Sequence, residues 1–420
     1  MEVCKQQQAI ELINKGENVL MLGAGGVGKS YVIKQIADDS TLVLAPTGIA
    51  ALNIGGMTCH RAFKLPLGLP TQKDRTTVHR STASLFSSSK ITRIVIDEVG
   101  MLRTDVLDLI DLKLQKIKRN KLPFGGIQMV LVGDFFQLEP IVGYREQSEF
   151  YSLYDSPFCF SSAAFSNFHT IELTKVYRQE DERQVKILDA IRKGTKYSWL
   201  ALQRINEESK VYNPLEDRLH LCAYKKDAEV VNTRRYNEIK DKAHIFKATL
   251  QGKQCKWTEA PVGEIVRLKE GCKVVVCAND PDGEYVNGDR GVILRIEGKA
   301  IGVELLNGNL VWIEEYTWEK HSYKGTGKKL TKVVENSMTQ IPLALGWAIS
   351  IHKSQGMTLD DVVLDTGKGC FSHGQLYVAL SRIKDLRRLS LTKPLTTREL
   401  IVRDDVTNYY RNINIMETTT

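Results

Sequence analysis

The stretch NVLMLGAGGVGKS, residues 18–30, decides the fold of the first part of the chain. Its apolar run from Val19 to Leu22 is typical of a buried strand, and the helix-like segment YVIKQIADD follows the glycines. The turn between them matches the G-x-x-x-x-G-K-[ST] pattern of a phosphate-binding loop. A chance glycine-rich turn is the alternative, but the strand before it and the helix after it are the context that the motif requires. The stretch therefore predicts a nucleoside triphosphate site.

Each residue type in this loop has a chemical reason. Glycines let backbone N–H groups turn inward around phosphate oxygens, and Lys29 meets the β- and γ-phosphates as a point charge. The hydroxyl of Ser30 reaches Mg²⁺, so we expect ATP and Mg²⁺ as cofactors. The residues predicted to contact the nucleotide are Gly23, Ala24, Gly25, Gly26, Val27, Gly28, Lys29 and Ser30.

Length, composition and charge narrow the class of protein. The 420 residues predict roughly two to four domains. With 42% apolar and 26% charged residues the composition is that of a globular protein, and no apolar run approaches the ~20 residues that span a bilayer. The formal net charge of +8 suits a polyanionic partner such as nucleic acid, although many proteins carry such a surplus on a solvated surface.

The termini and cysteines indicate the compartment. The N-terminus, MEVCKQQQAIE, has neither the basic nor the apolar region of a signal peptide. Eight cysteines are scattered without the paired spacing of a zinc site, so we expect reduced thiols. We therefore expect the cytoplasm of a bacterial or phage-infected cell, or the nucleus for a eukaryotic or viral chain, and no membrane partner.

Three further apolar runs extend the first domain. They are TLVLAPTG at residues 41–48, ITRIVIDEVG at 91–100 and GIQMVLVGDFFQL at 126–138. Strands that are hydrophobic throughout and separated by helical patterns favour a parallel sheet covered on both faces, and hence an α/β fold. The serine-rich and basic stretch at 65–90 has a different composition and predicts a small insertion that projects from the sheet.

A second αβ pattern begins near Phe165, with a strand expected at 171–176. From about Ala248 the texture changes to short alternating strands, with Asn-Gly turns at Asn287 and Asn307 that indicate hairpins. This segment predicts a small barrel-like β-domain inserted in the second αβ domain. The predicted domains are 1–160 with an insertion at about 61–90, 161–247 together with 337–420, and the inserted β-domain at 248–336.

Polar residues follow two of the predicted strands. Asp97 and Glu98 end the run at 91–100, where a nucleotide hydrolase needs one carboxylate for Mg²⁺ and one to orient the attacking water. Gly133, Asp134 and Gln137 follow the next strand, on the edge where αβ folds collect ligands. Gln137 suits a sensor of the water or the γ-phosphate. The alternatives are a chance acidic pair and an ordinary polar loop residue.

The ordered motifs resemble one family. GAGGVGKS, APTGIAALNIGGMTCH, VIDEVGM, FGGIQMVLVGDFFQL, LTKVYRQ, YVNGDRG, IHKSQGMTLD and GQLYVALSR are similar to those of the PIF helicases, in the RecD-like branch of superfamily one that also holds the phage Dda helicase. The resemblance extends from Gln6 to about Leu391. It implies two RecA-like domains that clamp ATP and move 5′ to 3′ along single-stranded DNA, with an SH3-like inserted β-domain.

The resemblance also implies roles at the nucleotide. Gln6 resembles the adenine-reading glutamine, although the adjacent Gln7 and Gln8 leave the register open. Arg178 and Arg382 resemble arginines that the second domain presents to the γ-phosphate. An arginine supplied on domain closure contributes ~10³ to 10⁵ in rate in related chemistry. Gly356, Gly374 and Gln375 would lie at the same cleft.

The strand-gripping residues come from the same resemblance. Hydroxyl, imidazole and amine groups would hold phosphates without reading base sequence. Ordinary packed histidines and a plain Asn-Gly turn are the alternatives for several of them. The implied residues are Thr47, Thr58 and His60 in the first domain, His352, Lys353 and Ser354 in the second, Asn287, Gly288 and Arg290 in the inserted β-domain, and Phe63 with the 64–90 insertion at the place of the strand-separating wedge.

Three positions depart from the family pattern. Val27 stands where a threonine is usual, Gly100 where a serine usually follows the acidic pair, and Glu139 where a proline usually follows FFQL. None of the three removes a group that catalysis requires, so the departures bear on the subfamily.

An ATP-driven 5′ to 3′ DNA helicase acting in replication, repair or recombination is the leading hypothesis. The expected partners are single-stranded DNA, forked or 5′-tailed duplex DNA, and single-strand-binding or replication proteins, with a monomeric chain. A non-unwinding single-strand-binding protein regulated by ATP and a RecD-like subunit of a nuclease complex are the alternatives. RNA as a substrate stays open, because backbone contacts discriminate poorly between the two nucleic acids.

Overall fold

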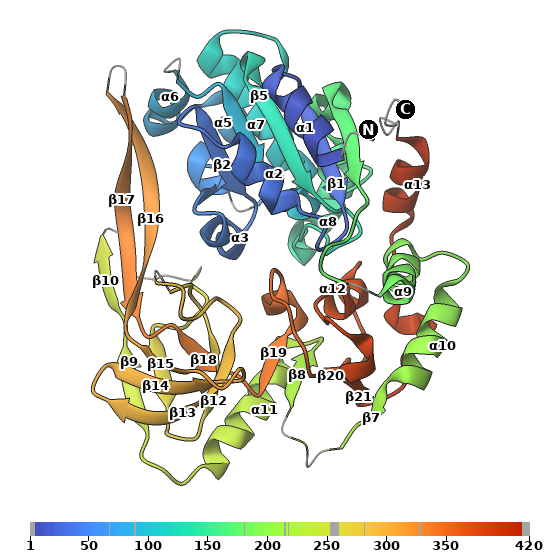
Figure 1. The fold of residues 1–420 in the computed structure, drawn as a ribbon. Helices are drawn as coiled ribbons and strands as arrows, with labels where there is room; N and C mark the ends of the chain where they lie inside the picture. The colour runs from blue at the N-terminus through green and yellow to red at the C-terminus, as the bar shows by residue number, and fades with distance from the viewer. Residues whose placement is uncertain are drawn as a thin grey trace. The chain divides into compact units, whose positions relative to one another are not determined.

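The computed structural model divides the chain into two compact units (Figure 1). The first unit comprises Met1–Glu180, His321–Val334 and Val402–Thr420, and the second comprises Asp181–Lys320 and Glu335–Ile401. Every helix among the described residues is too short or too polar to cross a membrane. The structure describes residues 5–66, 68–87, 90–179, 181–213, 216, 218–252, 260–280, 282–326 and 329–413.

A six-stranded sheet in which every pair of neighbours is parallel forms the centre of the first unit. The predicted parallel α/β sheet is therefore confirmed. The strands are hydrophobic throughout because both faces are covered, and all five residues of the strand before the phosphate loop are buried. In order across the sheet they are β3 (Met57–Thr58), β2 (Thr41–Ala45), β4 (Arg93–Ile96), β5 (Gln128–Gly133), β1 (Val19–Gly23) and β6 (His169–Leu173).

Alternate residues of these strands enter two different cores. Leu20 and Leu22 pack in the core that holds the buried side of α7 (Thr104–Lys118). Val19 and Met21 pack in the core formed with α1 (Lys5–Asn14) and α2 (Lys29–Ile36). Because successive side chains of a strand point to opposite faces, β1 is held from both sides by helices.

The insertion at 65–90 is anchored to the first unit. It contains α5 (Gln72–Thr76) and α6 (Arg80–Ser87), and it follows α4 (Cys59–Phe63). The Nζ atoms of Lys113 and Lys116 on α7 donate to the carbonyl oxygens of Thr77 and Arg75 at 2.9 and 2.7 Å. The backbone N–H of Leu69 donates to Glu146 at 2.9 Å, just before α8 (Gln147–Leu153). Residues 67, 88 and 89 of the insertion lie outside the described ranges.

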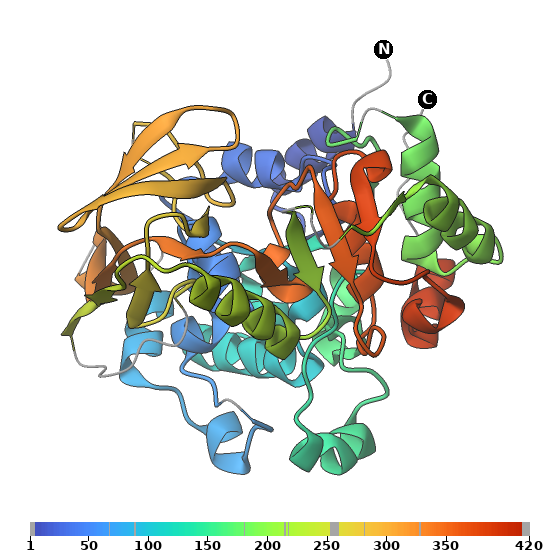
Figure 2. The same cartoon turned by 90° about the horizontal axis from the view of Figure 1, so that it is seen from below.

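The second unit contains its own parallel sheet. Helix α11 (Lys225–Glu238) lies along it (Figure 2), and the side-chain amide of Asn232 pairs with both backbone groups of Ala348 at 2.7 and 2.9 Å. The other α-helices among the described residues of this unit are α9 (Glu182–Lys193), α10 (Ser198–Glu208) and α12 (Gln375–Ser381). The strand order is β19 (Ala348–Ser350), β8 (Leu219–Cys222), β20 (Val362–Asp365), β21 (Leu389–Leu391) and β7 (Lys210–Val211).

Antiparallel sheets are inserted in the second half of the chain, as the hairpin signals predicted. The turn at Asn307 and Gly308 joins two neighbouring strands, with Gly308 at a φ of 86°. The five-stranded sheet has the order β15 (Leu310–Ile313), β14 (Ala300–Leu305), β13 (Arg290–Glu297), β12 (Lys273–Val276) and β18 (Leu343–Leu345). The smaller sheets pair β11 (Ile265–Leu268) with β9 (His244–Lys247), and β17 (Lys329–Gln340) with β10 (Thr249–Gly252) and β16 (Tyr316–Thr326).

Three predicted boundaries are wrong. Strand β6, expected to open the second αβ domain, pairs with β1 over its whole length and completes the first sheet. The antiparallel region begins before residue 248, at β9, which pairs with β11. It ends after residue 336, at β18, which pairs with Val274 to Val276 of β12. The C-terminal helix α13 (Asp404–Asn412) belongs to the first unit, whereas residues 337–420 were all assigned to the second domain.

Candidate functional site

The phosphate-binding loop joins the end of β1 to the first turn of α2. Gly26 and Gly28 have φ angles of 84° and 87°, which only glycine adopts without strain. Gly28 is also the residue that precedes α2, and no side chain caps the helix there. The first N–H groups of α2 are therefore directed at the space that the loop surrounds, which makes this helix end a site for an anion.

The loop is packed so tightly that it has no room for larger residues. A Cβ atom at Gly23 would lie 2.7 Å from the carbonyl oxygen of Leu173, at the end of β6. A Cβ atom at Gly26 would lie 2.6 Å from Cβ of Arg178, and one at Gly28 would overlap the side-chain amide of Gln6. The loop glycines are thus required by close approaches from β6 and α1 as well as by the backbone angles.

Lys29 lies over the loop that it follows. Its Nζ atom donates to the carbonyl oxygens of Gly23 and Ala24 at 2.8 and 2.9 Å. Burial and the charge of Glu98 raise the pKa of Asp97, and the positive charge of Lys29 acts in the opposite direction. The amine is therefore held at the loop and acts on Asp97, where a β- or γ-phosphate would meet it.

The acidic pair follows β4 directly. Asp97 is 8% exposed, and it accepts a hydrogen bond from the backbone N–H of Glu98 at 2.9 Å. Burial, followed by the charge of Glu98, raises the pKa of Asp97 to about 7. Glu98 has a φ of 52°, a left-handed conformation that is unfavourable for a residue with a side chain. Strain of this kind is concentrated at functional sites.

These residues suit a magnesium ion bound together with phosphates. A divalent cation beside Asp97 would stabilise the ionised carboxylate that burial disfavours. Ser30 adds an exposed hydroxyl on the first turn of α2. Among the described residues no group of three or more His, Cys, Asp or Glu is arranged to hold a metal by itself. One carboxylate with one hydroxyl is typical of Mg²⁺, which keeps several waters and binds phosphate oxygens.

The sensor candidate Gln137 lies beside the acidic pair. A Cβ atom at Gly133, which ends β5, would lie 2.8 Å from the backbone nitrogen of Val99, and one at Gly100 would lie 2.5 Å from the carbonyl oxygen of Asp134. These close approaches leave no room for a Cβ atom at either glycine. Gln137 is 4% exposed, and its backbone N–H donates to Asp134 at 3.2 Å.

Two of the three glutamines on α1 have different partners. The side-chain amide of Gln6 donates to the carbonyl oxygen of Val27 at 3.1 Å, so Gln6 lies against the phosphate loop. Gln7 bonds Glu11 on its own helix. Tyr177, which the sequence analysis did not single out, is 52% exposed and approaches Gly28. Its position inside the LTKVYRQ motif was the available signal.

Arg178 belongs to the first unit, so the prediction that the second domain supplies it is wrong. It follows β6, and the preceding N–H of Tyr177 donates to the carbonyl oxygen of Gly26 at 2.8 Å. The physical reason is the pairing of β6 with β1, which carries the LTKVYRQ segment to the phosphate loop.

The second unit holds Arg382, Gln375 and Gly356. Arg382 is 3% exposed, and its guanidinium donates to Val378 O and Ser381 Oγ, both at 3.3 Å, at the end of its own helix α12. The side-chain amide of Gln375 donates to Ala223 O and accepts from the N–H of Phe371, both at 2.9 Å. Gln375 therefore joins α12 to the end of β8. Gly356 has a φ of 82°.

The proposed strand-gripping residues of the first unit differ in exposure. Thr47 and Thr58 cap the helices α3 (Gly48–Asn53) and α4, accepting from Ala50 N and Arg61 N at 3.3 and 3.2 Å. Each threonine is partly exposed, as is His60. Phe63 is fully buried and stacks on Phe86 of α6 at 4.6 Å between ring centroids. The prediction that Phe63 contacts DNA is therefore wrong for this structure, because its ring fastens the insertion to the core.

The corresponding segment of the second unit is the 3₁₀ helix η6 (Ile351–Ser354). The ring of His352 stacks on Phe371, and burial lowers the pKa of His352, which keeps the imidazole neutral. Ser354 is fully buried and donates to Ile351 O at 2.7 Å, so its hydroxyl stabilises the turn instead of facing a strand. Lys353 is exposed and lines a cavity of about 430 Å³.

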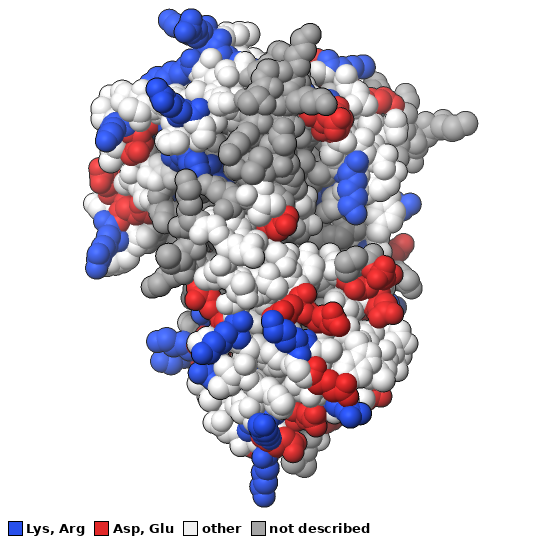
Figure 3. Space-filling view, turned by 90° about the vertical axis from the view of Figure 1, so that its left-hand side faces the viewer, with Lys and Arg blue, Asp and Glu red and all other residues white. Residues whose placement is uncertain are grey.

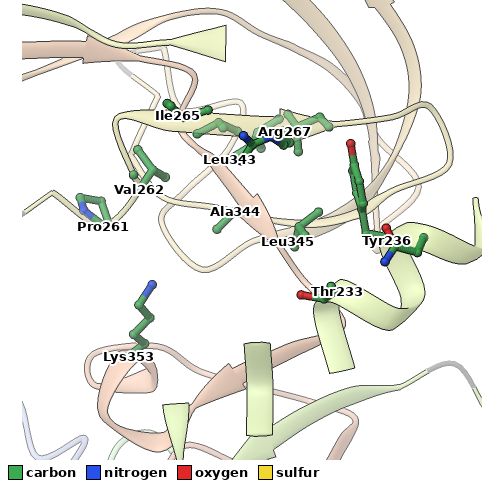
Figure 4. A pocket seen from close by; sticks show the side chains of 14 residues that line it. Thr233, Tyr236, Pro261, Val262, Ile265, Arg267, Leu343, Ala344, Leu345 and Lys353 are labelled. Atoms are coloured by element: carbon green, nitrogen blue, oxygen red, sulfur yellow. The ribbon is translucent and has the colours of Figure 1, made fainter. Parts of the chain in front are cut away.

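The cavity beside Lys353 lies within the second unit (Figure 4). The amine of Lys353 points into it from η6, Tyr236 comes from α11, and Arg267 comes from β11. On the face that Figure 3 shows, Lys and Arg side chains are interspersed with Asp and Glu among the described residues, so charge alone does not mark a binding stripe there. The whole lining is Thr233, Tyr236, Asn237, Pro261, Val262, Gly263, Ile265, Val266, Arg267, Leu268, Leu343, Ala344, Leu345 and Lys353.

The Asn287–Gly288 turn lies close to Met357, just after η6. A Cβ atom at Gly288, whose φ is 99°, would lie 3.3 Å from Cγ of Met357. The N–H of Asn287 donates to Asn279 Oδ1 at 2.8 Å, and Arg290 donates to Asp361 O at 3.4 Å. The inserted sheet is therefore attached to the stretch that contains IHKSQGMTLD.

Gly26 provides a test of the loop geometry, with Gly16 as a matched control. The φ angles of Gly26 and Gly16 are 84° and 89°, but a Cβ at Gly16 meets no atom within 4 Å. Gly26→Ala and Gly16→Ala should each lose about 1–2 kcal/mol of stability from the backbone alone. Only Gly26→Ala should also lose affinity for a fluorescent ATP analogue, because its Cβ displaces Arg178. Equal affinity in the two variants would contradict the packing described.

Asp97 provides a test by pH. The carboxyl of Asp97 binds its proton more tightly in the folded protein than in the unfolded chain. The free energy of unfolding therefore falls as the pH rises from the ordinary carboxyl pKa of 3.8 toward about 7. Without divalent cations, Asp97→Asn should melt at a higher temperature than the parent at pH 8, with the gain shrinking toward pH 4. Asp38→Asn is the control of opposite sign, because hydrogen bonds from Ser40 lower the pKa of Asp38. A lower melting temperature for Asp97→Asn at pH 8 would refute the raised pKa.

Comparisons with known proteins agree with this site. Residues 3–202 match the model of the PIF1-like helicases. The chain is 31% identical to Pif1 of a Bacteroides species, solved with ADP-AlF4, at a TM-score of 0.87 over 98% of this chain and 96% of that one. It is 29% identical over 420 residues to the ATP-dependent DNA helicase Pif1 of Bdellovibrio bacteriovorus, covering 97% of this chain and 91% of that protein.

The human relative, ATP-dependent DNA helicase PIF1, is 32% identical over 399 residues, which are 92% of this chain and 60% of the human protein. The chain thus spans about 60% of the length of that relative. Since the family model, the phosphate loop and the match to 96% of the Bacteroides structure agree, the chain belongs to the PIF1-like helicase family of superfamily one.

Proposed function

We propose that the chain is an ATP-dependent DNA helicase that moves 5′ to 3′ along single-stranded DNA and unwinds duplex. The observation that supports the proposal is that the amine of Lys29 binds the phosphate loop and acts on the carboxyl of Asp97, at the end of β4. Among the relatives, Bacteroides Pif1 has been solved bound to single-stranded DNA, and Pif1 helicases have been described at forked duplex DNA.

The residues of the first unit have distinct roles in hydrolysis. Lys29 and the N–H groups of the loop bind the phosphates, and Ser30 with Asp97 would hold Mg²⁺, which neutralises charge on the phosphoryl oxygens. Glu98 orients and polarises the attacking water, and Gln137 contacts the water or the γ-phosphate. Arg178, from the segment beside Gly26, adds positive charge near the same phosphate.

Gln6 and Tyr177 would bind the base. Both approach the loop at Gly28, where an amide can pair with the edge of adenine while an exposed ring stacks on its face. This pairing would position the nucleotide without contributing to the chemical step.

The coupling of ATP hydrolysis to movement along the strand would require the second unit. The two units would act as RecA-like domains, with Arg382 reaching the γ-phosphate on closure after leaving its bonds to Val378 and Ser381. Gln375 and Gly356 would shape the same face of the second domain. Hydrolysis would then depend on closure, so each ATP would drive one cycle of movement along the strand.

The strand would be held by exposed groups of both units and of the inserted β-domain, which we propose to be SH3-like. Thr47, Thr58, His60, His352 and Lys353 would contact phosphates, and the Asn287–Gly288 turn would guide the strand. The insertion at 64–90 would separate the strands at a fork. We propose that the reaction takes place in a bacterial or phage-infected cytoplasm or in a nucleus, with single-strand-binding or replication proteins as partners.

Arg382 tests the closure mechanism. Lys29→Ala should lose both ATP binding and DNA-stimulated ATPase. Arg382→Ala should keep nucleotide affinity while its DNA-stimulated rate falls by roughly 10³-fold or more, because an arginine that completes the site acts on the transition state. Arg387→Ala is the matched control, since Arg387 is exposed and pairs with Asp385 at 2.9 Å. Normal hydrolysis by Arg382→Ala would refute the closure mechanism.

Strand displacement tests the function itself. With ATP, the chain should unwind a 5′-tailed duplex and a fork but leave a 3′-tailed duplex intact, and Lys29→Ala should unwind none. A parallel reaction with an RNA tail measures the preference for DNA. ATP hydrolysis without displacement of any strand would favour a single-strand-binding protein regulated by ATP, and cleaved DNA products would favour a nuclease subunit.

A further inference from the structure

The C-terminal helix α13 packs on the first unit with one apolar side. Val406 is fully buried, and Tyr409 and Tyr410 are partly buried. Asp404, Asn408 and Arg411 are exposed. The helix is therefore amphipathic, and the rings on its buried side have specific partners.

Those partners are the two phenylalanines of the GDFFQL motif. The ring of Tyr410 stacks on Phe136 with centroids 4.5 Å apart, and Tyr409 meets Phe135 edge-on at 5.4 Å. Tyr409 also stacks on Phe160 at 4.4 Å, with 7° between the ring planes. Phe135 and Phe136 are 0% and 2% exposed, so neither ring can turn away without leaving a void.

The two phenylalanines lie between Asp134 and Gln137, in the turn that presents the sensor. The N–H of Phe136 donates to Asp134 Oδ1 at 3.1 Å, and the N–H of Gln137 donates to Asp134 O at 3.2 Å. The place of the two rings consequently determines the backbone from which the side chain of Gln137 extends.

An ion pair fastens the other end of the same turn. Arg403, which precedes α13, donates to Glu139 at 3.2 Å and to Asp405 at 2.9 Å. Glu139 thus connects the end of the sensor turn to the start of the C-terminal helix.

We infer that α13 is a positioning element for Gln137, with Tyr410, Tyr409 and Arg403 as positioning residues for ATP hydrolysis. The inference rests on the proposed function. The phosphate loop is supported by β6 and α1, whereas the sensor turn is supported by α13. Loosening α13 should therefore slow the chemical step while the nucleotide still binds.

The test separates positioning from plain stabilisation. Tyr410→Ala should lower kcat for DNA-stimulated ATP hydrolysis by roughly 10- to 100-fold, the effect of a catalytic group displaced by about 1 Å. The KM for ATP and the affinity for ADP should stay unchanged. Tyr410→Phe keeps the stacking ring and should restore kcat, and Asn408→Ala, on the exposed side of the same helix, should match the parent.

Leu114→Ala controls for stability. Leu114 is fully buried on α7 in the same core, so its truncation should lower the melting temperature without moving Gln137. Arg403→Ala and Glu139→Ala should each lower kcat, and the double variant should be no slower than the slower single variant. Parent-like kcat in Tyr410→Ala, or an equal loss of kcat in Leu114→Ala, would overturn the inference. A parent chain that hydrolyses no ATP would overturn the proposed function as well, and the two failures are distinguishable.

Discussion

The close packing of β1 between β5 and β6 is the constraint on which the rest of the site depends. Strand β5 brings the GDFFQL turn to one side of the phosphate loop, and β6 brings Tyr177 and Arg178 to the other. A Cβ atom added at Gly23 would lie less than 3 Å from Leu173, and one added at Gly26 would lie less than 3 Å from Arg178. The loop and the segment after β6 can therefore only be altered together. A nucleotide bound here would therefore contact one continuous body of packed backbone.

Contiguous motifs were the part of the site that the sequence could predict. The phosphate loop, Asp97 with Glu98, and Gln137 each follow a hydrophobic strand, and local chemistry is sufficient to recognise them. Hydrophobic periodicity shows where strands lie but not which strands are neighbours, so it could not show that β6 belongs to the first sheet. For that reason Arg178 was assigned to the wrong unit, although its motif was recognised.

Burial explains the other misplaced residues. Phe63 and Ser354 stand inside matched motifs, but Phe86 covers the first and the turn of η6 encloses the second. Both partners become visible only in the fold. The contact of Glu139 was equally hidden, since its partner Arg403 lies directly before the last helix and no motif links the two. The predicted barrel-like insertion extends further than its turns indicated, because β9 and β18, outside the predicted bounds, pair with strands inside it.

The left-handed backbone of Glu98 has a consequence for attempts to make this chain more robust. At a φ of 52° a glycine or an asparagine would relieve strain, and the neighbouring Asp97 is a buried carboxyl that a neutral residue would replace at a gain in stability. A search guided only by thermal tolerance would thus select changes at these two adjacent positions first. Under the proposed function, the protein obtained in this way would be more stable but would no longer hydrolyse ATP, so the acidic pair has to be held constant in any such library.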